Sequence, residues 1–192
     1  MKRSKWLKAM LSVLVLLTAA ARCEAPYSNP PPTFQESDLV GTWEARYMEW
    51  GVDRLIFRAD GTFKQIYHDH IVEGYVYETP WNEWWVERFP DGRVRVHLQG
   101  ARYYFAGIRT AELDGMGDPC PEKLPDCGWE HRPRSFYDPI ADESLHMVGE
   151  LVLNVRSDSS GELLLHHMWT TRDRGFAIIG GKAEEFCRID TP

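Results

Sequence analysis

Positive charge is scarce in this 192-residue chain, which has 22 Lys and Arg against 29 Asp and Glu and a formal net charge of −7. Such a surface repels phosphate backbones and anionic lipid headgroups. No later segment supplies a compensating basic patch. The sequence therefore predicts no nucleic-acid partner.

The chain also lacks an apolar run of the roughly 20 residues that a membrane-spanning helix needs. Its main apolar run, residues 9–21, follows a basic head that contains Lys2, Arg3 and Lys5, and it ends in three alanines. This layout is typical of an export signal. We therefore expect residues 1–21 to be an export signal and the mature protein to be extracytoplasmic, with 18 basic against 29 acidic residues and a net charge of −11.

Cysteine is rare, with four in the chain. Cys23 follows the signal and begins a Pro-rich stretch, so residues 22–37 resemble the lipidated cysteine and tether of bacterial lipoproteins. The resemblance implies membrane attachment only through a lipid on Cys23. The alternative is a secreted protein in which Cys23 is a thiol or pairs with Cys187. Because an extracytoplasmic compartment permits disulfides, Cys120 and Cys127 are predicted to pair with each other.

Catalytic motifs are absent from the sequence, which has no Gly-x-Ser-x-Gly, no His-Glu-x-x-His and no phosphate-binding glycine loop. His68 and His70 lie on one face of a predicted strand, and Glu73 or His97 would complete a metal site. However, Tyr67 has the opposite parity and marks the core side. The sequence thus predicts no catalytic residue, metal or cofactor, and an enzyme that uses a metal or carboxylates is the less favoured alternative.

Apolar residues recur mainly with period two, which predicts β-strands. Turns at residues 58–61, 89–92 and 156–161, each ending in glycine, predict three hairpins. The predicted strands are residues 39–48, 52–57, 62–69, 73–78, 84–88, 93–98, 101–108, 145–155, 162–169, 176–179 and 183–189. Strands with one dry face close into a barrel, which removes exposed edges. The sequence therefore predicts an all-β fold in which an antiparallel meander closes into a β-barrel.

Gly41-Thr42-Trp43 and the following Asp-Gly hairpin resemble the opening of bacterial lipocalin-like proteins and, more broadly, of the calycin barrels that include lipocalins and avidins. The resemblance implies a lipocalin-like β-barrel over residues 38–192. It also implies that Trp43 closes the barrel base and that Arg188, from the last strand, covers the indole. Packing in the core alone is the other reading of Trp43.

A Pro- and Gly-rich insertion, residues 107–143, interrupts the pattern and is predicted to be a functional lid or a disordered segment. Adjacent residues on a strand face opposite sides, so at least one indole of Trp84 and Trp85 faces outward. By the same alternation His167 is predicted to be a buried, hydrogen-bonded histidine. Parity also places five aromatic residues where interior walls could be: Tyr75, Tyr77, Trp85, Phe105 and Trp169.

These aromatic residues predict a protein that binds a small apolar or aromatic ligand inside the barrel. The alternative is a non-catalytic interaction module that contacts another protein or a cell-wall glycan through its outward tryptophans. The state of the interior discriminates the two predictions. An empty cavity favours a ligand carrier, and a filled interior favours the interaction module.

Overall fold

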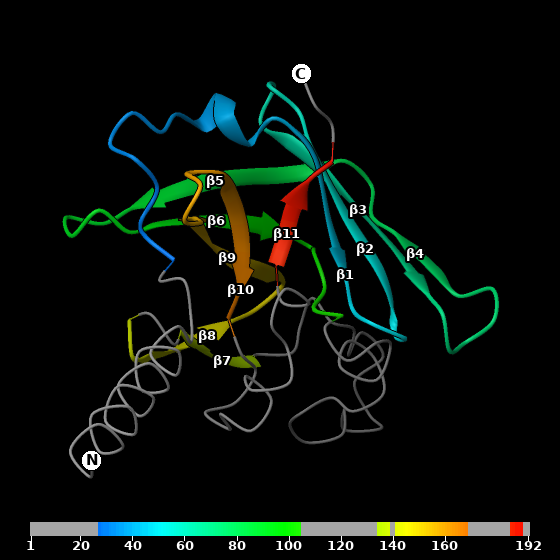
Figure 1. The fold of residues 1–192 in the computed structure, drawn as a ribbon. Helices are drawn as coiled ribbons and strands as arrows, with labels where there is room; N and C mark the ends of the chain where they lie inside the picture. Colours follow the sequence, from blue (N-terminus) through cyan, green and yellow to red (C-terminus); the bar gives the residue numbers. More distant parts are fainter. Residues whose placement is uncertain (1–26, 105–133, 139–140, 169–184, 190–192) are drawn as a thin grey trace, which may run out of the picture.

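The computed structural model describes residues 27–104, 134–138, 141–168 and 185–189. These residues form a short 3-10 helix and eleven strands (Figure 1). The elements are η1 (Glu36–Leu39), β1 (Gly41–Arg46), β2 (Gly51–Phe57), β3 (Thr62–Asp69), β4 (Val76–Glu78), β5 (Asn82–Arg88), β6 (Val94–Gln99), β7 (Arg134–Asp138), β8 (Glu143–Met147), β9 (Glu150–Ser157), β10 (Leu163–His167) and β11 (Glu185–Arg188).

Eight of the strands close into a barrel. Their order, β1-β2-β3-β5-β6-β9-β10-β11, follows the chain, and each strand is antiparallel to the next. β11 pairs with β1 and closes the ring. Figure 1 shows this seam, where β11 (red) lies beside β1. The predicted antiparallel meander, with the topology of a lipocalin-like barrel, is confirmed.

The three predicted hairpin turns are also confirmed; they join β2 to β3, β5 to β6 and β9 to β10. Gly61 and Gly92 have φ angles of 80° and 86°. Residues with a side chain adopt this left-handed backbone only at a cost, which explains the glycine in these turns. In the first turn the carboxylate of Asp60 accepts a hydrogen bond of 3.0 Å from the backbone N–H of Thr62.

β4 and β5 are two parts of one strand that runs beside β3 and is interrupted by a bulge. β3 pairs Tyr67 with Tyr77 on β4 but Phe63 with Asn82 on β5, so the interruption inserts one extra residue. An extra residue reverses the alternation of side chains. Odd-numbered residues of β4 and even-numbered residues of β5 therefore face the barrel interior.

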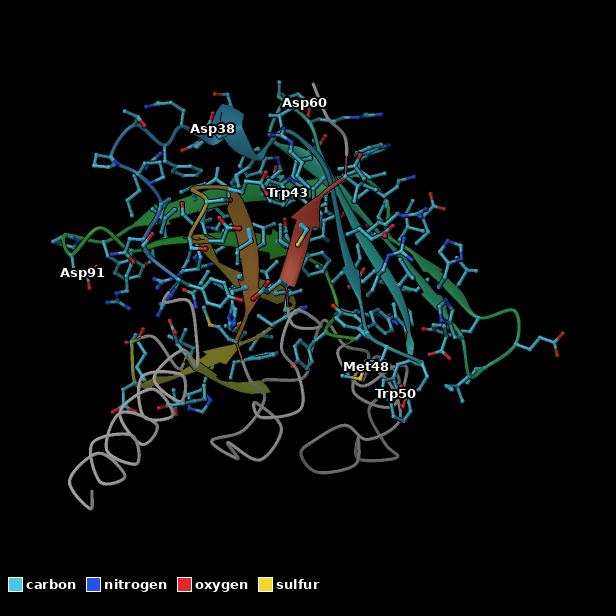
Figure 2. All side chains as sticks on the ribbon, viewed as in Figure 1. Asp38, Trp43, Met48, Trp50, Asp60 and Asp91 are labelled. Atoms are coloured by element: carbon cyan, nitrogen blue, oxygen red, sulfur yellow. The ribbon has the colours of Figure 1, made fainter. Side chains whose placement is uncertain are left out.

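The end of the barrel beside η1 is closed by Trp43. Its indole is 0% exposed, and the indole N–H donates a hydrogen bond of 2.8 Å to the carbonyl oxygen of the last η1 residue. Arg188 lies opposite Trp43 in the β1–β11 register, with its guanidinium carbon 5.6 Å from the ring centroid. The same guanidinium donates to the carbonyl oxygens of Asp38 and Val40. Figure 2 shows Trp43 towards the barrel end marked by Asp38.

The hairpin of β7 and β8 packs on the outer face of the barrel. The carboxylate of Asp138 accepts hydrogen bonds from Arg95 on β6 at 2.6 Å and from Asn154 on β9 at 3.2 Å. Both partners are buried although they face away from the interior. The prediction that β6 and β9 each have one dry face is therefore wrong where the hairpin covers them. The prediction of a structureless insertion is also wrong for residues 134–138, which form β7.

The Pro-rich stretch packs against the barrel over its described part, residues 27–37. Ser28 and Ser157 exchange two backbone hydrogen bonds of 3.0 Å, and Phe34 is 2% exposed. This part of the predicted tether therefore packs on the barrel domain.

Two predicted strands differ from the structure. Residues 101–104 are not a strand, because the chain turns at Gly100, where φ is 74°, and enters the barrel. The predicted strand 145–155 is instead divided between β8 and β9 by a turn at Val148 and Gly149.

Other predictions concern residues outside the described part of the chain and stay predictions. They are the export signal, the fate of Cys23, the disulfide between Cys120 and Cys127, and the strand 176–179. Among the described residues, no helix has both the length and the hydrophobicity that crossing a membrane requires.

Candidate functional site

Four polar side chains meet inside the barrel at the end opposite η1. Tyr47 follows β1, Asp53 lies on β2, Gln65 on β3 and His167 at the end of β10. The Tyr47 hydroxyl lies 2.6 Å from Nε2 of His167 and 3.5 Å from Oδ2 of Asp53, and the Gln65 amide donates to the same Oδ2 at 2.9 Å. Asp53, Gln65 and His167 are 0% exposed. The predicted buried, hydrogen-bonded His167 is confirmed.

Burial disfavours charge in this cluster. It raises the pKa of the Asp53 carboxyl well above its usual value, and this outweighs the opposite effect of the hydrogen bond from Gln65. Burial likewise lowers the pKa of His167 to about 3, with a further contribution from the adjacent His166. Burial thus keeps the imidazole neutral at pH 7 and favours the protonated form of the carboxyl, because an ion in this position would lose its hydration.

Two atoms of the cluster, Oδ1 of Asp53 and Nδ1 of His167, have no hydrogen-bond partner among the described residues. We assign the Tyr47 proton to the short contact with Nε2 of His167, which leaves the imidazole proton on Nδ1. Oδ2 of Asp53 accepts from Gln65, so the carboxyl proton is assigned to Oδ1. On this assignment Nδ1 of His167 is a hydrogen-bond donor, and Oδ1 of Asp53 is one when the carboxyl is protonated.

Tyrosine rings surround the cluster at this end of the barrel. The ring of Tyr104 stacks on that of Tyr67 with a centroid distance of 3.9 Å and an interplanar angle of 7°. The hydroxyls of Tyr75 and Tyr104 are 3.0 Å apart, and the ring of Tyr77 lies 5.7 Å from that of Tyr104. Tyr67 and Tyr104 are fully buried, whereas Tyr75 and Tyr77 are half-buried. Aromatic surface is thus accessible at this end.

Deeper in the barrel the described side chains fill the interior. A cavity that admits water would expose the atoms that line it, but these residues are 0% exposed: Leu55, Phe63, Val96, Leu98, Leu151, Leu153, Leu165 and Phe186. A barrel of eight strands is wide enough to be filled by side chains or to hold one small ligand. Here side chains occupy the deep interior, and the accessible aromatic surface lies at the tyrosine-lined end.

The structure brings together two of the five predicted ligand-binding residues, Tyr75 and Tyr77, through their common neighbour Tyr104. Phe105 and Trp169 lie outside the described residues. The binding role of all four remains a prediction.

The expected interior position of Trp85 is wrong. Its side chain is 45% exposed on the outer face of β5 and stacks on His97, with ring centroids 4.9 Å apart. Trp84, which is 8% exposed, takes the interior position. The bulge between β4 and β5 reverses the alternation and explains the exchange. The prediction that one indole of this pair faces outward is confirmed.

Sequence reasoning missed Asp53 and Gln65, although a signal was present. Asp53 has the same parity as Leu55 and Phe57, and Gln65 has the same parity as Tyr67. A polar residue at a core position of a strand must find a partner inside the protein. Searching the predicted strands for such residues would have identified both.

His68, on β3, and His70, which follows the strand, face outward as predicted, because both are exposed and Tyr67 is buried. His97 lies elsewhere, 3.2 Å from a carboxylate oxygen of Glu87 and 3.2 Å from one of Glu150. Within the described ranges, no group of three or more His, Cys, Asp and Glu side chains is arranged to hold a metal ion.

A polar cleft lies outside the barrel between the N-terminal stretch and β6 and β9, lined by Tyr27, Ser28, Asn29, Asp91, Arg93, Ala141 and Arg156. Its arginines already have acceptors. Arg156 donates to Oδ1 of Asn29 at 2.7 Å, and Arg93 pairs with Asp91 at 2.7 Å. The Arg156 contact attaches the N-terminal stretch to the barrel, as does a hydrogen bond of 3.1 Å from Nδ2 of Asn29 to the carbonyl oxygen of Asp91, so the cleft is a structural junction.

The fold and the site define an antiparallel eight-strand β-barrel whose interior holds a buried polar cluster beneath a tyrosine-lined end. The chain matches no protein-family model, no curated protein and no solved structure.

Proposed function

We propose that this protein is a non-catalytic, lipocalin-like binding protein and that it binds a small apolar or aromatic molecule at the tyrosine-lined end of the barrel. The observation that carries the proposal is the half-burial of Tyr75 and Tyr77, next to fully buried Tyr67 and Tyr104. Half-buried rings in an aromatic cluster offer a ligand apolar surface and edge or face contacts.

The uncharged polar cluster adds a chemical preference. Asp53 and His167 supply donors without a charge, so a neutral ligand avoids the desolvation that an ion would suffer there. Neutral aromatic molecules are therefore favoured over fatty-acid anions. The resemblance of residues 41–43 to lipocalin-like proteins supports the same class of function.

A panel of isoprenoids, fatty acids, haem and neutral aromatic compounds, read by thermal shift and intrinsic fluorescence, tests the proposal. Ligand binding raises the melting temperature by mass action. Tyr77→Ala should weaken the binding of a hit about tenfold or more, and Trp85→Ala, which removes an outer aromatic ring, should leave it unchanged. Absence of binding below about millimolar, together with no co-purified molecule in native mass spectrometry, contradicts the proposal.

The exposed Trp85 favours a second candidate function, an interaction module for a protein or a cell-wall glycan. Its indole is 45% exposed, and His97 supports the opposite ring face. Exposed aromatic surface of this kind often marks a contact site. The filled deep interior also agrees with this alternative. Binding to isolated cell-wall material that Trp85→Ala abolishes and Tyr77→Ala does not would favour the module.

We further propose that the protein works outside the cytosol, either tethered through lipidated Cys23 or secreted. Residues 1–21 have the layout of an export signal, and the acidic charge of the remaining chain disfavours nucleic acid and anionic membranes as partners.

A further inference from the structure

The chain itself occupies the tyrosine-lined end of the barrel. After β6, residues 101–104 turn inward instead of continuing the sheet beside β5. Ala101 and Tyr104 are 0% exposed, and Tyr103 is 2% exposed. Figure 1 shows this stretch (green) leaving β6 and crossing the end of the barrel that lies away from η1. Residues 101–104 are called the inner segment below.

Gln65 holds the inner segment through both ends of its side-chain amide. The backbone N–H of Arg102 donates to Oε1 of Gln65 at 2.7 Å, and Nε2 of Gln65 donates to the carbonyl oxygen of Arg102 at 2.8 Å. Nε2 also donates to Asp53, which fixes the orientation of the amide. Gln65 thus presents one donor and one acceptor, side by side, and they bind the N–H and C=O groups on either side of the Arg102 Cα.

Tyr67 supplies a flat surface next to this amide. Its hydroxyl donates to the carboxylate of Asp69 at 2.8 Å and lies 3.1 Å from the carbonyl oxygen of Trp50, so the ring is held in place. Tyr104 of the inner segment lies flat on this ring at 3.9 Å. The inner segment therefore satisfies two adjacent chemical features, the Gln65 amide with a backbone N–H and C=O and the Tyr67 ring with an aromatic ring.

We propose that Gln65 and Tyr67 form a binding subsite for a neutral, planar aromatic molecule that carries an amide-like edge, and that the inner segment occupies this subsite as an internal competitor. This inference rests on the proposed function and names its ligand class. The ligand ring stacks on Tyr67 in place of Tyr104, and its N–H and C=O groups bind Gln65 in place of Arg102.

An internal competitor lowers the apparent affinity by the fraction of molecules in which the subsite is open. Weakening the inner segment should therefore tighten ligand binding while it lowers the stability of the free protein. Substitution of a residue with a merely structural role would lower both the ligand affinity and the stability. This opposite response of affinity and stability is the signature of competition.

The test uses two matched probes, 2-quinolone, which has an amide edge, and quinoline, which lacks it. Arg102→Pro removes the N–H that binds Gln65. This variant should bind 2-quinolone about tenfold more tightly than the unaltered protein, since one competing hydrogen bond is lost. Its affinity for quinoline should rise less. Tyr104→Ala, which vacates the ring position without altering Gln65, should also tighten the binding of 2-quinolone.

Gln65→Leu in the Arg102→Pro background removes the side-chain amide that binds the N–H and C=O groups of the ligand. The ratio of the affinities for 2-quinolone and quinoline should then fall to about one. Circular dichroism checks that each variant folds, and Tyr104→Ala decides the question if Gln65→Leu does not fold. Unchanged 2-quinolone affinity in both Arg102→Pro and Tyr104→Ala overturns the inference. If compounds of the wider panel still bind at Tyr77, the proposed function stands and only the subsite assignment fails.

Discussion

Asp53 gives the sharpest test of the barrel interior. Burial raises the pKa of its carboxyl in the folded protein, whereas in the unfolded chain the carboxyl ionises near pH 3.9. Folding therefore takes up a proton at pH values between the unfolded and the folded pKa, and the free energy of unfolding falls as pH rises from 3.9 through this range. Asp53→Asn removes this titration. Its amide keeps an oxygen for Gln65 and an N–H donor where the carboxyl proton lies.

The magnitude follows from the linkage between protonation and folding. Each pH unit between the unfolded pKa and the working pH contributes about 1.4 kcal/mol, so a carboxyl that stays protonated at pH 7 lowers stability by up to about 4 kcal/mol relative to a neutral isostere. We expect Asp53→Asn to raise the free energy of unfolding by about 1 to 4 kcal/mol at pH 7. The difference should vanish near pH 4.

Urea denaturation of both proteins between pH 4 and pH 8 measures this difference. His167 titrates in both proteins and cancels from the comparison. Asp60→Asn is the matched control, because hydrogen bonds from Thr62 lower the pKa of the exposed Asp60 carboxyl. The control should be less stable than the unaltered protein at pH 7, with a smaller deficit at pH 4. A destabilised Asp53→Asn protein whose deficit grows with pH would refute a protonated Asp53.

Three further outcomes are expected. Trp43→Ala should lower the free energy of unfolding by about 3 to 5 kcal/mol. Arg188→Ala should lower it by about 0.5 to 1 kcal/mol less in the Trp43→Ala background than in the unaltered protein. Additive losses in this double-mutant cycle mean that the cation does not interact with the ring. Cys23→Ser should move the protein from the membrane fraction to the soluble fraction, and an unchanged distribution argues against the lipid anchor. Peptide mapping without reductant should find Cys120 joined to Cys127, with a stabilisation of about 2 to 3 kcal/mol, and two free thiols would disprove the bond.

Most of the barrel could be predicted because local features of the chain dictate it. Period-two alternation marked the strands, and the Asp-Gly turns marked hairpins with bounds close to those of β2, β3, β5 and β6. Alternation also identified the buried His167 and the outward-facing His68. These features depend only on neighbours a few residues away, so they are readable from sequence.

Alternation failed where the chain departs from a regular ladder. A one-residue bulge between β4 and β5 exchanged the positions expected for Trp84 and Trp85, and the turn at Gly100 sent residues 101–104 into the barrel. Pro80, between β4 and β5, was a signal of the interruption, because proline within a strand pattern marks an edge or a bulge, but it does not give the number of inserted residues. Two of the three described ligand-binding residues, Tyr75 and Tyr77, precede the bulge and keep their expected face.

The sequence by itself determined the strands, their turns and the closure of an antiparallel meander, because backbone geometry and side-chain alternation act locally. Only the tertiary structure decided the site. Tyr47, Asp53, Gln65 and His167 come from four strands or strand ends, and the distances between their polar atoms depend on the register around the closed barrel. Burial then removes charge from Asp53 and His167, and burial is a property of the whole packed barrel that no single segment contains.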